Sequence, residues 1–113
     1  MKNPRLAVLA VLILVGLIGC SSNSRPTMRV RNERATKANV QFKDASGNTT
    51  NINDVPGGST SAYSDINVGA YTVTAGIQNE AIAPTATFTA LRDERYTVVV
   101  LTGTTPTLRV DRP

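Results

Sequence analysis

Apolar and polar residues alternate with a period of two along most of the chain from residue 28 onward. This is the period of a β-strand with one buried face, because successive side chains point to opposite faces of a sheet. No part of this region has the apolar period of a helix. The pattern therefore predicts an all-β domain. Its clearest stretch is 70–77, where every second residue is apolar: Tyr71, Val73, Ala75 and Ile77.

Turn residues divide this alternating pattern into short strands. Glycine, proline, asparagine and charged residues cluster between the apolar stretches, as at 44–48 and 56–59. The stretch 96–101 is apolar on both faces for three residues, so we expect this strand in the interior of a sheet. About seven or eight strands at this spacing are typical of an antiparallel β-sandwich or small barrel. The predicted strands are 28–31, 40–43, 50–55, 61–67, 70–77, 85–91, 96–101 and 107–110.

The N-terminal residues follow a different pattern. Lys2 and Arg5 precede the stretch 6–18, which is apolar and uncharged. A helix needs roughly 20 apolar residues to span a bilayer, so this stretch is too short for a permanent membrane helix. A positive segment, a short apolar helix and small residues before a cleavage point are the parts of a secretory signal peptide.

The apolar stretch ends in Leu17-Ile18-Gly19-Cys20, which resembles the lipobox of bacterial lipoproteins. The resemblance implies cleavage between Gly19 and Cys20, and acyl chains such as palmitate on Cys20. Two or more chains make a stable anchor, whereas a single chain binds a membrane only marginally. Cys20 is the only cysteine, so the domain must fold without a disulfide.

This interpretation divides the chain into a signal peptide (1–19), a lipidated cysteine with a flexible tether (20–27) and a β-sandwich domain (28–113). Removing 19 residues from 113 leaves 94, enough for one domain with its own core. The expected location is the bacterial cell envelope, with the lipid in a cell membrane. Ser21 follows the cysteine where inner-membrane lipoproteins often have aspartate, which favours the cell outer membrane.

The strand and turn residues of the domain resemble those of a known group. The stretches are Met28-Arg29-Val30-Arg31, Val40-Gln41-Phe42, Ser61-Ala62-Tyr63, Gly69-Ala70-Tyr71-Thr72-Val73, Tyr96-Thr97-Val98-Val99 and Leu108-Arg109-Val110. They resemble small immunoglobulin-like β-sandwich domains of the bacterial envelope, which often occur on lipoproteins and surface proteins. The resemblance covers most of residues 28–113 and implies a single immunoglobulin-like sandwich of antiparallel strands.

The residue types favour binding over catalysis. The chain has no histidine, and lipidation of Cys20 removes its thiol, so the usual general base and thiol nucleophile are missing. We therefore expect no enzyme and no cofactor. Asp44, Ser46 and Asn48 alternate as in a calcium loop but lack the closing glutamate, so no metal is expected. Removing Lys2 and Arg5 from 12 basic residues leaves ten against eight acidic ones, too small an excess to indicate nucleic acid.

Four arginines near the tether are the candidate contact residues: Arg25, Arg29, Arg31 and Arg34. Arg29 and Arg31 are two positions apart, so a regular strand places both on its solvent face. Basic residues close to an anionic membrane gain about 1 kcal/mol each. The alternative is a solvated strand face whose arginines prevent pairing of sheet edges.

The resulting hypothesis is a non-catalytic accessory module that docks on another envelope component, most simply an envelope protein. The alternative is a domain that binds glycan or a surface polymer through the loops 48–54 and 79–84. Tyr63 is the one tyrosine expected to be exposed, while Tyr71 and Tyr96 are expected in the core.

Overall fold

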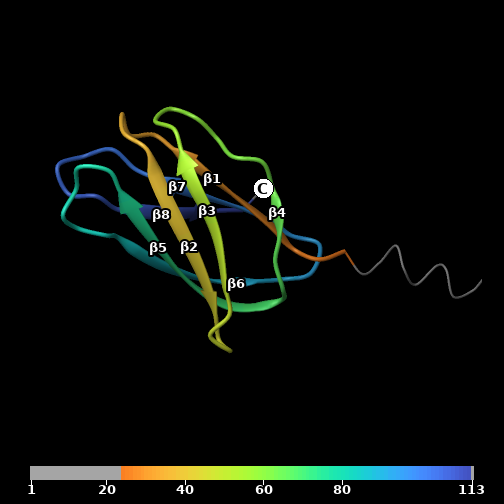
Figure 1. Cartoon of the computed structure of the whole chain (residues 1–113). Coiled ribbons are helices and arrows are strands. Elements are labelled where there is room, and N and C mark those ends of the chain that lie inside the picture. Colours follow the sequence, from red (N-terminus) through yellow and green to blue (C-terminus); the bar gives the residue numbers. More distant parts are fainter. Residues whose placement is uncertain (1–23, 113) are drawn as a thin grey trace, which may run out of the picture.

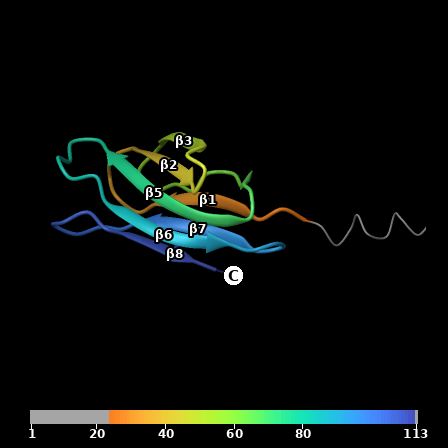
Figure 2. The same ribbon diagram turned by 90° about the horizontal axis from the view of Figure 1, so that it is seen from below.

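The computed structural model describes residues 24–112, which form two β-sheets packed face to face (Figures 1 and 2). The strands are β1 (Thr27–Asn32), β2 (Ala38–Asp44), β3 (Thr49–Val55), β4 (Ser64–Asp65), β5 (Gly69–Ile77), β6 (Thr85–Ala90), β7 (Arg95–Val100) and β8 (Leu108–Asp111). One sheet has the order β4-β1-β7-β8 and the other β3-β2-β5-β6. The predicted all-β sandwich is confirmed. Among the described residues, no helix is long and apolar enough to cross a bilayer.

β1 pairs in parallel with β7, from Thr27 opposite Arg95 to Asn32 opposite Val100. The prediction of antiparallel strands throughout is therefore wrong for this pair, although the other strand pairs are antiparallel. The physical reason is that alternation identifies the buried face of a strand but not its neighbour. β1 and β2 lie in different sheets, whereas the first two strands of an immunoglobulin constant domain share one sheet.

The core lies between the two sheets and is built from the inward positions of each strand. Phe88, a partly buried residue of the edge strand β6, packs against this core, with its ring centroid 4.8 Å from that of Tyr96 and 5.6 Å from that of Tyr71. The predictions that both tyrosines are core residues and that β7 is an interior strand are confirmed. The buried residues include Met28, Val30, Val40, Phe42, Val55, Ile66, Val73, Ala75, Ile77, Val98 and Val100.

The segment before β5 is less regular than predicted. β4 contains only Ser64 and Asp65, whereas the alternation predicted a strand over 61–67. Ser61 is bonded to β1 by one backbone and one side-chain hydrogen bond. The Ser61 N–H donates to Val30 O, and the Ser61 hydroxyl accepts the Val30 N–H. Side-chain bonds of this kind replace the regular backbone ladder and shorten the strand.

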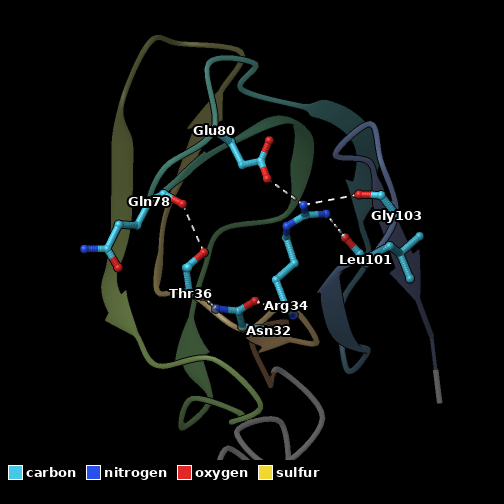
Figure 3. A network of polar contacts seen from close by, with 7 residues as sticks. All are labelled: Asn32, Arg34, Thr36, Gln78, Glu80, Leu101 and Gly103. Atoms are coloured by element: carbon cyan, nitrogen blue, oxygen red, sulfur yellow. Dashed lines mark hydrogen bonds and ion pairs between the residues drawn. The ribbon is translucent and has the colours of Figure 1, made fainter.

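β1 ends at Asn32, a buried polar residue that joins the two sheets. Its amide nitrogen donates to the carbonyls of Thr36 (2.7 Å) and Val55 (3.0 Å), and its amide oxygen accepts the Arg34 N–H at 3.0 Å. Figure 3 shows this amide beside the loop that leaves β1. Both donor hydrogens and the acceptor are thus satisfied, as a buried amide requires. These bonds hold the crossing from β1 to β2.

The hydroxyl of Tyr96 fixes the turn between β6 and β7, which yields a prediction. It accepts the Leu91 N–H at 2.9 Å and donates to Thr89 O at 3.1 Å, whereas the Tyr71 hydroxyl accepts only the Asn67 N–H. Tyr96→Phe leaves two backbone groups unpaired and should lower the free energy of unfolding by about 1–3 kcal/mol. Tyr71→Phe is the matched control and should cost less. Urea unfolding measures the two losses, and equal losses would contradict this role of Tyr96.

Candidate anion-binding face

The outward side chains of β1, β7 and β8 form rows across three neighbouring strands. The register places Arg29, Thr97 and Asp111 in one row, and Arg31, Val99 and Arg109 in the next. A depression of about 500 Å³ hollows this surface. We call it the arginine face, and its lining residues are Arg29, Arg31, Glu33, Tyr63, Arg95, Thr97, Val99, Arg109, Asp111 and Arg112.

Val99 forms the apolar floor of the arginine face. It lies on the outer side of its sheet, yet only 1% of its surface is exposed. Its ladder neighbours are Arg31 and Arg109, whose long aliphatic stems are placed to cover it while their charged ends reach water. The two arginines are therefore held to the sheet by packing of their stems as well as by charge.

The guanidinium groups of Arg29 and Arg95 lie over the ring of Tyr63. The Cζ atom of Arg29 lies 4.6 Å from the ring centroid and that of Arg95 lies 5.5 Å from it. Both distances are within the range of cation–π attraction. The Nε of Arg29 also donates to the Thr97 hydroxyl at 3.1 Å. Tyr63 is half-exposed, as predicted, but its ring positions arginines rather than offering a bare platform for a sugar.

Arg29 and Arg95 differ from the other arginines of this face in their ion pairing. Within residues 24–112 neither pairs with a carboxylate. The other three do, since Arg31 pairs with Glu33 at 3.3 Å, Arg109 with Asp111 at 2.8 Å and Arg112 with Glu94 at 3.6 Å. Exposed pairs of this kind contribute little to stability and are screened by salt.

The arginine face carries a surplus of positive charge. Five arginines line it, against the two carboxylates Glu33 and Asp111, which leaves a surplus of three. The hydrogen bond from Arg109 lowers the pKa of Asp111, so this carboxyl is ionised at neutral pH. The same hydrogen bond raises the pKa of Arg109. Planar guanidinium groups bind phosphate or carboxylate through two parallel N–H donors. The chemistry that this arrangement supports is therefore anion binding.

The candidate residues chosen from the sequence fall in three places. Arg29 and Arg31 share the outer side of β1, where the strand alternation places them. Arg25 lies in the segment 20–27 predicted as the tether, and it donates to Asn67 Oδ1 at 3.1 Å, outside the arginine face. Arg34 lies beyond the far end of β1. Gly19 and Cys20, the predicted cleavage and lipidation residues, lie outside the described residues.

Arg34 is occupied by intramolecular bonds. Its guanidinium donates to the carbonyls of Leu101 (2.8 Å) and Gly103 (3.2 Å), and it pairs with Glu80 at 2.7 Å (Figure 3). Only 12% of its side chain is exposed. It joins the loops after β1, β5 and β7 at the end of the sandwich opposite the tether. The structure therefore separates Arg34 from the other three arginines, and gives it a structural position.

Three arginines of the face were not singled out from the sequence: Arg95, Arg109 and Arg112. Arg109 and Asp111 alternate with Leu108 and Val110, and from this signal an outward arginine on the last strand could have been predicted. Arg95 lies just before the predicted strand 96–101, but it is the first residue of β7. Their convergence depends on which strands are neighbours, and alternation carries no signal for that.

The two loops proposed for glycan binding lie at opposite ends of β5. Asp44, at the β2–β3 turn, pairs with Tyr71 near the start of β5, while residues 79–84 follow Ile77 at its end. Most of 48–54 belongs to β3 itself. The Asp44 carboxylate accepts the N–H groups of Ser46 and Asn48 at 2.9 Å, which makes it part of the turn. These loops therefore do not form one site.

Comparisons with known proteins bear on the fold alone. No model of a known protein family matches the chain, and no curated protein does. One similar solved structure is an NMR structure of a protein from Eubacterium rectale, with a TM-score of 0.57 and 15% sequence identity. The match covers 81% of this chain and 91% of that one. At this identity the likeness supports the β-sandwich architecture and nothing further.

The charge balance of the arginine face predicts opposite effects of two changes. Replacing Arg29 and Arg95 by glutamine should weaken binding to heparin, a polyanion, by about 1 kcal/mol or roughly fivefold per arginine. Asp111→Asn removes a negative charge and releases Arg109, so it should strengthen binding. The salt concentration that elutes each variant from a heparin column measures both effects.

A matched control uses Lys43 of β2 and Lys37, which directly precedes β2, because a double change to glutamine there removes the same charge away from the arginine face. Elution that depends only on net charge, equal for the lysine and arginine variants, would contradict a site on the arginine face.

Proposed function

We propose that this chain is a lipid-anchored module of the bacterial cell envelope that acts without catalysis. In this proposal acyl chains on Cys20 hold the domain at a membrane, and the arginine face docks on an anionic group of another envelope component. The lipobox Leu17-Ile18-Gly19-Cys20 supports the anchor. The arginine face supports the docking.

The observation that best supports docking is that Arg29 and Arg95 form no ion pair with a carboxylate within residues 24–112. Both guanidinium groups are held beside the Tyr63 ring at a depression in the surface, and neither has a carboxylate partner within residues 24–112. Docking an anion there displaces no ion pair within residues 24–112, and the hydrogen bond with which the anion competes is the one from Arg29 to Thr97. The face is thus organised before a partner arrives, which lowers the entropic cost of binding.

An anionic surface polymer or glycan is the second candidate partner. The depression is open and polar, and its arginines are spread over three adjacent strands, which suits a chain of repeating phosphate or carboxylate groups. This alternative uses the arginine face, and not the loops 48–54 and 79–84.

In-cell crosslinking of the full-length chain, followed by mass spectrometry, distinguishes the two partners. We expect one dominant envelope protein that is lost in the variant with Arg29→Glu and Arg95→Glu, because charge reversal repels an anionic partner. The matched control is Lys37→Glu, directly before β2, with Lys43→Glu in β2, and this variant should retain the partner.

The outcomes separate the proposals. Crosslinks to polymer or glycan alone, lost in the same arginine variant, would move the assignment to the second candidate. A protein partner that survives reversal of Arg29 and Arg95 but not of the lysines would contradict docking through the arginine face.

A further inference from the structure

The chain enters the sandwich between two turns that each expose an apolar residue. Ser24 O accepts the Asp93 N–H at 3.1 Å, and Pro26 O accepts the Ile66 N–H at 3.0 Å. The entering segment is therefore bonded on one side to the β6–β7 turn and on the other to the segment before β5. Figure 2 shows the entering segment at the same end of the sandwich as the β6–β7 turn.

Val68 and Leu91 are the exposed apolar residues at this end. Val68 is 53% exposed and Leu91 is 45% exposed. Val68 directly precedes Gly69 and Leu91 directly follows Ala90, and Gly69 and Ala90 are paired in the ladder of β5 and β6. The two side chains therefore extend from adjacent strand ends. We call Val68 and Leu91 the apolar pair.

Two arginines lie close to the apolar pair. Arg25 is bonded to Asn67, next to Val68, and Arg92 follows Leu91 directly. The acidic residues of the same turn are Asp93 and Glu94, and Glu94 pairs with Arg112 at 3.6 Å. Exposed apolar side chains beside arginines match the interface of a bilayer, where apolar groups enter the acyl boundary and arginines meet phosphates.

From these observations we infer that the apolar pair is a membrane-docking surface whose partner is the lipid bilayer itself. The inference rests on the proposed anchor at Cys20. Cys20 lies four residues before Ser24, so even a fully extended tether keeps this end within roughly 14 Å of the lipidated cysteine. At that distance a weak contact suffices, because the tether makes the docking step intramolecular.

Docking at this end orients the whole domain. β1 and β7 start at the docked end, and β8 finishes there. The row that contains Arg29, Thr97 and Asp111 is the nearer of the two rows to the tether. The arginine face then stands on the side of the domain, and the network of Arg34 lies at the end away from the bilayer. The geometry leaves the arginine face open to a neighbour beside it in the envelope.

Single tryptophans test the inference, because the chain contains no tryptophan. The full-length chain with Val68→Trp or Leu91→Trp is expressed in bacteria, and the processed, acylated protein is purified. It is then reconstituted in vesicles of phosphatidylethanolamine and phosphatidylglycerol, with or without bromine on the acyl chains. The matched control is Ile82→Trp, at a position 55% exposed in the loop at the opposite end. We expect brominated lipid to reduce the emission of the first two variants and to leave that of the control unchanged.

Three other results would overturn the inference in distinguishable ways. Equal quenching at all three positions of an acylated protein would contradict docking while leaving the anchor intact. Blue-shifted emission without quenching would mean that protein, such as a second copy of this chain, covers the apolar pair. A mass spectrum without acyl chains on Cys20 would contradict both the anchor and the docking that rests on it.

Discussion

The arginine face depends on the parallel pairing of β1 with β7. Arg29 and Thr97 are 68 residues apart in the chain, and the pairing brings them into one row and into a hydrogen bond. β8 pairs with the other edge of β7. The β1–β7 pairing therefore also places Arg109 and Asp111 in the same rows as the arginines of β1, one strand further across the sheet. If β1 paired instead with β2, the next strand in the chain, Arg29 and Arg31 would lie on the opposite sheet from Arg95 and Arg109.

The two ends of the sandwich are built differently, and this difference gives the domain a direction. At the end away from the tether, Asn32 and Arg34 use their polar groups on backbone carbonyls and on Glu80 (Figure 3). Those bonds are buried or part-buried, and they connect the loops at that end. At the tether end, by contrast, the apolar pair faces solvent, and Arg29 and Arg95 lie without carboxylate partners among the described residues. The groups available to a partner are therefore concentrated at the tether end and on the arginine face.

Strand positions could be predicted from the sequence because alternation is a local property. The stretch 70–77 became β5 almost residue for residue, and the outward placement of Arg29 and Arg31 followed from the same rule. Strand neighbours could not be predicted, because the alternation of β1 is equally compatible with a parallel or an antiparallel partner. Arg34 shows a second limit. In the sequence it resembles Arg29 and Arg31, and only the loops that meet at the far end distinguish it.

The most direct measurement is an NMR titration of the mature protein with pyrophosphate, observed at the backbone amides and the arginine Nε–H groups. Anion binding to the arginine face predicts shifts at Arg29, Arg95 and Arg109 and in β7, which lies between β1 and β8, with little change in β2 and β3. Shifts centred on the loop 79–84, or spread evenly over all basic residues, would contradict the assignment of this face as the docking site.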